Sequence, residues 1–320
     1  MTRTRVPVLV DCDTGVDDAI ALLYLLGHPD VEIVAVTSVF GNNRARTCAL
    51  NTLSVLQLAG RNDIPVAVGS ERPLVGEASY LATHVHGSDG LGDAGIAPAD
   101  PGRLSPLSAT ELIAEAAARH AGELRILAVG PLTNLARAVE AHPELVGQVR
   151  DVVIMGGAAD VAGNQSPAAE ANIIHDPEAA QAVIAAGWET TLVPLDVTMT
   201  ELLTDDHRAA LEATGAPIPR FVAAITDFYF ERYGKDSYGH RCSPCHDALA
   251  AAILTGEMVP TIFPRLHLEV DCTDGPGRGA TIVDTRGRWK GFPDQEGATC
   301  RVALQTDGTF PGKLLARLGA

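Results

Sequence analysis

The chain lacks long apolar runs and an excess of basic residues. Its longest apolar stretches, such as residues 248–254, are too short to span a bilayer. With 24 basic and 40 acidic residues the net charge is −16, which argues against a nucleic-acid partner or an anionic membrane surface. The N-terminal residues also lack the apolar segment and cleavage site of a signal peptide, so we expect a cytoplasmic protein.

Cysteine and aromatic residues are also scarce. The six cysteines are expected to be free thiols, because a cytoplasmic chain of this size rarely forms disulfides. Cys242, Cys245 and His246 match the C-x-x-C-H signature of c-type haem attachment. That attachment normally follows export, so we interpret the match as accidental.

Short apolar runs alternate with helical patterns over the first two thirds of the chain. The predicted strands are residues 6–10, 33–39, 64–68, 124–129, 152–155 and 189–194. The predicted helices between them are residues 18–26, 44–59, 109–120, 134–141 and 177–186. This alternation is typical of βαβ units, so we expect an α/β fold with an open, mostly parallel sheet and flanking helices.

The pattern changes after residue 194. Three further helices are predicted, at residues 201–213, 219–233 and 247–256, and they would form a helical subregion over one edge of the sheet. Residues 266–318 are expected to add strands and a last helix. Since no linker or internal repeat is visible, we expect a single domain over residues 1–320.

Four aspartates, Asp11, Asp13, Asp17 and Asp18, stand where the first predicted strand gives way to a helix. Ligands of open α/β sheets bind at this edge. Four like charges so close would take up protons unless a cation joined them, and carboxylates suit Ca²⁺ or Mg²⁺ better than zinc. Helix capping could explain Asp17 or Asp18, but it does not explain the other two at a buried strand end. The sequence therefore predicts a metal site.

Two later segments carry further polar groups. His246 and Asp247 precede a helix, where Asp247 could simply be a cap or could join a metal site to an acid/base site. Asn164, Glu170 and Asn172 lie on a long loop and offer both donors and acceptors, which suits a polyhydroxylated ligand such as a sugar. An ordinary surface loop explains these three residues equally well.

The scarce aromatic residues are unevenly placed. The chain has two tryptophans, five tyrosines and seven phenylalanines, and residues 221–238 hold Phe221, Phe228, Tyr229, Phe230, Tyr233 and Tyr238. Most of such a stripe is usually core, but Tyr229 and Tyr233 share one helical face that could cover a planar ring. The glycine-rich residues 84–92, which include His86, could form a flap over a site or an ordinary surface loop.

Taken in order, these segments resemble the nucleoside hydrolase family of the inosine–uridine-preferring type. The signature is Asp11-Cys-Asp-Thr-Gly-Val-Asp-Asp-Ala19. Further matching motifs are Gly41-Asn42-Asn43, Gly130-Pro-Leu-Thr-Asn134, Ile154-Met-Gly-Gly157, Asn164…Glu170…Asn172 and His246-Asp247. The resemblance covers nearly the whole chain. It implies a Rossmann-like sheet, one Ca²⁺ per subunit, a homodimer or homotetramer, and hydrolysis of the N-glycosidic bond of ribonucleosides to ribose and free base.

The resemblance also implies which residues hold the metal. Asp13, Asp18 and Asp247 would supply carboxylates to Ca²⁺, together with the main-chain carbonyl of Val129. Asp11 would lie behind these ligands as a supporting carboxylate.

The same resemblance assigns the ribose contacts. Asp17 and Asn172 would hold the 2′- and 3′-hydroxyls, with support from Asn42. Glu170 and Asn164 would bind the 5′-hydroxyl. The expected partner is therefore a small-molecule ribonucleoside, and no nucleic-acid or membrane partner is expected.

Cleavage of the bond needs an activated water and a leaving base that receives a proton or a hydrogen bond. A metal lowers the pKa of a nearby water, and Asp13 could accept its proton. His246 is the candidate donor to the base, because histidine titrates near neutral pH. His86, Tyr229 and Tyr233 would enclose the base.

Two departures from the family pattern leave the base preference open. Ala171 stands where members often carry an aromatic residue, and Cys245 stands where they often carry leucine. Both positions lie near the substrate by analogy.

Two other functions are compatible with parts of the sequence. A metal-dependent phosphatase could use Asp11 and Asp13. Such an enzyme needs a downstream lysine to hold the phosphate, and the chain has no lysine before Lys235. A non-catalytic protein that binds nucleosides or sugars is the other, and the presence of both Asp13 and His246 argues against it.

Overall fold

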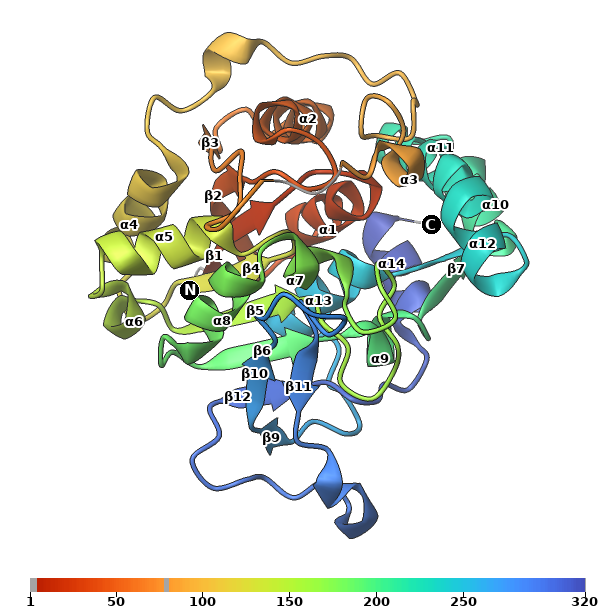
Figure 1. The fold of residues 1–320 in the computed structure, drawn as a ribbon. Helices are drawn as coiled ribbons and strands as arrows, with labels where there is room; N and C mark the ends of the chain where they lie inside the picture. The colour runs from red at the N-terminus through yellow and green to blue at the C-terminus, as the bar shows by residue number, and fades with distance from the viewer. Residues whose placement is uncertain (1–4, 78–80, 320) are drawn as a thin grey trace.

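A central sheet of eight strands runs through the computed structural model, which describes residues 5–77 and 81–319 (Figure 1). Its order is β3-β2-β1-β4-β5-β6-β12-β9. The strands are β1 (Val6–Cys12), β2 (Val31–Ser38), β3 (Val66–Val68), β4 (Arg125–Ala128), β5 (Asp151–Met155), β6 (Thr190–Val193), β9 (Arg265–Leu266) and β12 (Cys300–Val302). Only the β12–β9 pair is antiparallel within this sheet. The predicted α/β fold with a mostly parallel sheet is confirmed.

The strand order reverses between β1 and β4, as in dinucleotide-binding folds, and ligands bind at such a switch point. Asp11 in β1 is paired with Thr37 of β2 and Ala128 of β4. The backbone N–H of Val129 then donates to the Asp11 carbonyl at 2.9 Å. The aspartate-rich segment therefore leaves the sheet at the switch point.

Helices cover both faces of the sheet (Figure 1). On one face lie α1 (Val16–Leu26), α2 (Ala45–Leu58) and α13 (His246–Thr255), whose apolar residues share one core. On the other face lie α4 (Ala109–Arg119), α5 (Thr133–Ala141) and α8 (Pro177–Ala185), which belong to a second core. The sheet is thus buried on both sides, which explains why its strands are nearly continuous apolar runs.

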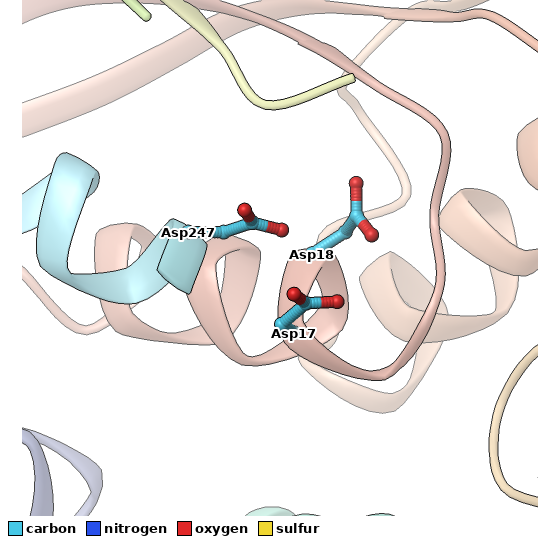
Figure 2. Close-up of side chains that lie close together, drawn as sticks. All are labelled: Asp17, Asp18 and Asp247. Carbon is cyan, nitrogen blue, oxygen red and sulfur yellow. The ribbon is translucent and has the colours of Figure 1, made fainter. Parts of the chain in front are cut away.

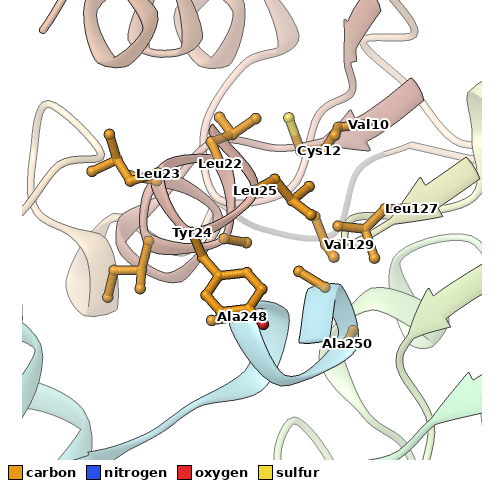
Figure 3. Packing of buried hydrophobic residues seen from close by; sticks show 14 of the residues in the cluster. Val10, Cys12, Leu22, Leu23, Tyr24, Leu25, Leu127, Val129, Ala248 and Ala250 are labelled. Carbon is orange, nitrogen blue, oxygen red and sulfur yellow. The ribbon is translucent and has the colours of Figure 1, made fainter. Parts of the chain in front are cut away.

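Close packing of α1 against α13 determines where the acidic residues meet. Figure 3 shows Leu25 and Tyr24 of α1 beside Ala248 and Ala250 of α13. The small alanines allow the two helices to approach closely, and full burial of a leucine such as Leu25 contributes about 1.5–3 kcal/mol. As a result, the N-terminal ends of α1 and α13 lie next to each other.

The predicted helical subregion is present, but its boundaries differ, and the predicted helix at residues 247–256 is not part of it, because α13 packs against α1 and the sheet. It consists of α10 (Asp205–Ala213), α11 (Pro217–Tyr229), a π-helix (Phe230–Gly234) and α12 (Lys235–Tyr238), grouped beside α3 (Thr83–His86) in Figure 1. The predicted helix at residues 201–213 is wrong at its start, because β7 (Leu202–Thr204) pairs there with β8 (Cys242–Pro244). The helix begins only after Thr204, whose side chain and backbone both bond to the His207 ring.

Several short elements were not predicted. Besides α3, α12, β7 and β8, they are α6 (Leu145–Gln148), α7 (Ala171–His175), α9 (Leu195–Thr198) and the 3₁₀ turns Pro101–Arg103 and Arg286–Lys290. The C-terminal part holds the expected strands and last helix, with β10 (Leu268–Val270), β11 (Thr281–Val283) and α14 (Phe310–Leu318) in addition to β9 and β12.

The C-terminal strand β12 pairs with β6, so the C-terminal part of the chain contributes to the main sheet. One domain over residues 1–320 stays a prediction. In residues 5–77 and 81–319, no helix combines the length and the apolar character that crossing a membrane requires.

Candidate active site

A cavity of about 220 Å³ opens where the carboxyl ends of β1, β4 and β5 meet the helical subregion. The residues singled out in the sequence that line it are Asp13, Asp17, Asn42, His86, Val129, Asn164, Glu170, Asn172, Tyr229, Tyr233, His246 and Asp247. Asp18 and Asp11 are not part of its lining, and both are buried. The structure therefore gathers residues from across the chain around one cavity.

Three carboxylates lie close together at one end of this cavity. Figure 2 shows Asp17 and Asp18 at the start of α1 and Asp247 at the start of α13. Each contributes an oxygen atom, and these atoms lie within 4.8 Å of one another. This trio contains Asp17, whereas the sequence-based metal set contains Asp13 in its place.

Asp13 is held next to the trio by the loop after β2 and the turn after β4. The backbone N–H of Asn42 donates to Asp13 Oδ2 at 2.7 Å, and the backbone N–H of Asp13 donates to Asp18 at 3.1 Å. A Cβ at Gly41 would collide with the Asp13 carboxylate, and one at Gly130 would lie 2.9 Å from Oδ1. Glycine at both positions thus makes room for this carboxylate.

Asp18 and Asp11 are supported by neighbouring hydrogen-bond donors. Asp18 Oδ2 accepts the backbone N–H of Gly15 at 2.8 Å and the Asn42 amide at 3.1 Å. Asp11 Oδ1 accepts the Thr37 hydroxyl at 2.5 Å and the Asn134 amide at 2.8 Å. Asn134 belongs to a motif noted in the sequence. Its contact with Asp11 joins α5 to β1, which are far apart in the sequence, so the motif alone did not predict it.

Burial of these carboxylates raises their pKa values. Removal from water raises the pKa of Asp11 and of Asp18 to about 7, and the charge of Asp17 adds to the effect at Asp18. Burial and then neighbouring carboxylates raise the pKa of Asp13 and of Asp247 well above the ordinary range. So many buried acids of one sign favour either bound protons or a bound cation.

The donor set fits a hard cation. Within the described part of the chain, the buried oxygens Asp13 Oδ1 and Asp17 Oδ1 have no hydrogen-bond partner. The clustered side chains Asp17, Asp18 and Asp247 offer only oxygens, as does the Val129 carbonyl just after β4, and oxygen ligands are the chemistry that Ca²⁺ prefers. The unpartnered oxygens are the expected result where a cation completes the site.

The loop after β5 forms the wall that the sequence assigned to the sugar. Glu170 caps α7 and accepts the backbone N–H groups of Asn172 at 2.9 Å and Gly157 at 3.0 Å. Burial raises the Glu170 pKa to about 7, while these bonds lower it. The Asn172 amide donates to the Val129 carbonyl at 3.1 Å, so this wall is joined to the metal side. Asn164 accepts from a backbone N–H of the same loop at 3.0 Å.

Four rings form a continuous row along the cavity. His86 and Tyr229 have ring centroids 5.5 Å apart, Tyr229 and Tyr233 are 5.3 Å apart, and Tyr233 and His246 are 5.7 Å apart. The Tyr229 hydroxyl also donates to Asp17 at 3.4 Å. These rings offer an apolar wall with hydroxyl and imidazole groups, which suits a planar heterocycle.

Both histidines of the row are neutral. Burial lowers the pKa of His86 to about 3 and that of His246 to about 4. His86 Nδ1 accepts the backbone N–H of Val16 at 3.1 Å, so its proton is on Nε2. His246 Nδ1 lies 2.8 Å from the Thr198 hydroxyl. The sequence analysis missed Thr198, because it stands in no recognisable motif.

The chain has clear relatives among known proteins. A family model described as inosine-uridine preferring nucleoside hydrolase matches residues 8–310. The chain is 35% identical to probable uridine nucleosidase 2 of Arabidopsis thaliana, over 97% of this chain and 96% of that protein. It is 38% identical to the pyrimidine-specific ribonucleoside hydrolase RihA of Citrobacter koseri, over 87% and 88%. The solved structure of a plant nucleoside hydrolase, the PpNRh1 enzyme, has a TM-score of 0.90 and 33% identity and covers 98% of this chain and 99% of its own.

The raised pKa values predict how the metal-free protein responds to pH. A carboxyl whose pKa rises from 3.8 to about 7 on folding stabilises the fold at low pH, and this stabilisation is lost as pH rises through 7. With a chelator present, thermal melting between pH 5 and pH 8 should show Tm falling by at least about 4 °C. Asp18→Asn should flatten this fall, whereas the exposed control Asp274→Asn should not.

Millimolar Ca²⁺ should raise Tm most at pH 8, where the carboxylates would otherwise be ionised and unpaired. A metal-free Tm that rises between pH 5 and pH 8 would contradict this description of the cluster.

Proposed function

The chain belongs to the inosine-uridine preferring nucleoside hydrolase family, and we propose that it hydrolyses ribonucleosides in a Ca²⁺-dependent reaction. Its enzyme class, a hydrolase of N-glycosyl compounds, follows from its relatives. The metal, the role of each residue and the preferred base are our proposals.

The observation that carries the proposal is that one cavity holds two chemically different sets of groups. One set is buried carboxylates with unpartnered oxygens, and the other is a row of rings with neutral imidazoles. The two sets meet where the Tyr229 hydroxyl donates to Asp17 at 3.4 Å. A ribonucleoside has the same division, with a hydroxyl-bearing sugar joined to a planar base. The bond between sugar and base would then lie where the two sets meet.

Asp13, Asp18, Asp247 and the Val129 carbonyl would hold Ca²⁺. When bound, the ion would supply positive charge that binds the ribose hydroxyls and makes a nearby water easier to deprotonate. Asp17, whose carboxylate belongs to the close trio, would contact the sugar from the same end of the cavity.

Asp13 would act as the general base. It would take one proton from water as the water oxygen forms a bond to the anomeric carbon. The bond to the base nitrogen breaks at the same carbon, and its electron pair leaves with the base. The sugar carries positive charge during this exchange, and the carboxylates of Asp17 and Glu170 stabilise it electrostatically.

The role that we propose for His246 differs in one respect from the role that the sequence suggested. That reasoning assumed a histidine that titrates near neutral pH, but burial lowers the pKa of His246 to about 4. A neutral imidazole supports the departing base by donating a hydrogen bond from Nε2–H. The Nε2 atom is buried and has no partner among the described residues, so it is available for this contact.

A phosphatase reaction is poorly supported by the cavity. No lysine or arginine is found among the described residues that line it, so a phosphate group would face carboxylates without a compensating cation from the protein. The alternative of a non-catalytic binding protein is disfavoured by the hydrolase relatives, whose alignments cover most of the chain.

The names of the two curated relatives refer to uridine and to pyrimidines, and we therefore propose uridine as a substrate. The family description includes inosine, so purine ribonucleosides belong in the same assay. Assembly as a homodimer or homotetramer and a cytoplasmic location stay predictions.

Replacement of Asp13 tests the general base. Asp13→Asn should lower kcat for uridine by about 10²–10⁴-fold, because an amide cannot accept the proton of water. Asp13→Ala should lose both the base and a metal ligand. Steady-state assays of released ribose, with Ca²⁺ in excess, provide the measurement, and near-normal turnover by the Asn variant would place the base elsewhere.

A comparison of uridine with 2′-deoxyuridine tests the sugar contacts. Loss of the 2′-hydroxyl would leave buried polar groups unpaired, so kcat/KM should fall by about 10³-fold or more. Similar values of kcat/KM for the two substrates would refute the roles of Asp17 and of the metal in binding ribose.

Replacement of His246 tests support of the leaving base. His246→Ala should lower kcat for uridine by about 10²-fold or more, but should have little effect on p-nitrophenyl riboside, whose leaving group needs no donor. If His246 only orients Asp247, both substrates will lose activity equally, and the role in leaving-group support would be withdrawn.

A further inference from the structure

Thr198, the last residue of α9, is fully buried beside His246. Its hydroxyl oxygen lies 2.8 Å from His246 Nδ1. In the described part of the chain, this hydroxyl has no other hydrogen-bond partner. The contact joins two elements that are far apart in the sequence.

The backbone on both sides of the contact is fixed. The N–H of Leu195 in α9 donates to the carbonyl of Gly157 at 2.9 Å, which ties α9 to the loop after β5. The N–H of Cys245, just before His246, donates to the carbonyl of Glu201 at 2.9 Å. Hydroxyl and imidazole therefore meet at positions that the surrounding structure sets.

The direction of this hydrogen bond follows from the single proton of the hydroxyl. If His246 Nδ1–H donated, the Thr198 proton would be buried without an acceptor, which is unfavourable. If Thr198 donates instead, its proton is bonded to Nδ1, and the single N–H of the neutral His246 ring is on Nε2. That atom belongs to a residue lining the cavity and has no partner among the described residues.

We infer that Thr198 is a positioning residue that fixes His246 in the tautomer with Nε2–H facing the leaving base. The inference rests on the proposed hydrolysis of ribonucleosides and adds to it the residue that sets the donor. As the electron pair moves onto the base, Nε2–H can donate a hydrogen bond to it. Donation from Thr198 to Nδ1 withdraws electron density from the ring and makes Nε2–H a stronger donor.

Substitutions at Thr198 separate this role from ordinary packing. Thr198→Val keeps the shape but loses the donor, and it should lower kcat for uridine by about tenfold or more, with a smaller change in KM. Activity on p-nitrophenyl riboside should change little. Thr198→Ser retains the hydroxyl and should restore most of the uridine activity.

Thr226→Val is the matched control. Thr226 is also buried, but its hydroxyl donates to the carbonyls of Val222 and Ala223 in its own helix and it does not line the cavity. This variant should leave the ratio of the two activities unchanged. Equal loss on both substrates in Thr198→Val, or a loss that Thr198→Ser does not restore, would overturn the inference.

A double mutant tests whether Thr198 acts through His246. Adding Thr198→Val to His246→Ala should lower kcat for uridine no further, because the donor that Thr198 positions is already gone. Independent losses that multiply in the double mutant would show that Thr198 acts by another route and would overturn the inference.

The tautomer can also be measured without any turnover. In the Ca²⁺-loaded, ¹⁵N-histidine-labelled protein, long-range ¹H–¹⁵N spectra should show His246 with its proton on Nε2, and the signals should shift in Thr198→Val. The signal that disappears in His246→Ala identifies the residue among the ten histidines. A proton on Nδ1 in the unaltered protein would overturn the inference. Absence of ribonucleoside turnover would overturn the proposed function while leaving this spectrum as a separate result.

Discussion

Electrostatic repulsion between buried carboxylates is the constraint on which the rest of this structure depends. Asp13, Asp18 and Asp247 are almost completely removed from water, and Asp17 lies within reach of the last two. Such a group is stable only with bound protons or with a cation. The fold supplies backbone N–H groups, the Asn42 amide and two glycine turns around these acids, but no buried lysine or arginine is found among the described residues to compensate them.

The same constraint links the metal side to the substrate side. Tyr229 reaches Asp17 with its hydroxyl, and Asn172 joins the loop after β5 to the Val129 carbonyl. Groups that would touch the sugar and the base are therefore in direct contact with the metal side of the site. The row of rings needs no such compensation, because its histidines are buried in the neutral form.

The fold and the acidic end of the site could be predicted because both are local in the sequence. The first strand ends at Cys12, between Asp11 and Asp13, and apolar runs that alternate with helical patterns are enough to indicate a parallel sheet. The position of Asp247 relative to α1 depends on helix packing, so it came from family resemblance and not from spacing. Residues 202–204 were wrongly included in a helix, because their pairing partner β8 is remote in the chain.

Other features left no local signal. Thr198 stands in a short helix that no pattern indicates, and only the tertiary structure places its hydroxyl against His246. The low pKa of His246 is likewise a consequence of burial, whereas the sequence shows only an imidazole. Sequence motifs thus indicated residues that the structure gathers around one cavity, and packing determined how their protons are arranged.

Proton release on Ca²⁺ binding is the most direct test of the central claim, that a cation replaces protons in the carboxylate cluster. Calorimetric titrations of the metal-free protein in buffers of different ionisation enthalpy measure the number of protons released per Ca²⁺ bound. Our account predicts that Ca²⁺ displaces protons at pH 6.5 and displaces fewer as pH rises towards 8.5, because Asp11 and Asp18 have pKa values of about 7 without metal. Tight Ca²⁺ binding with no proton release at any pH in this range would contradict it.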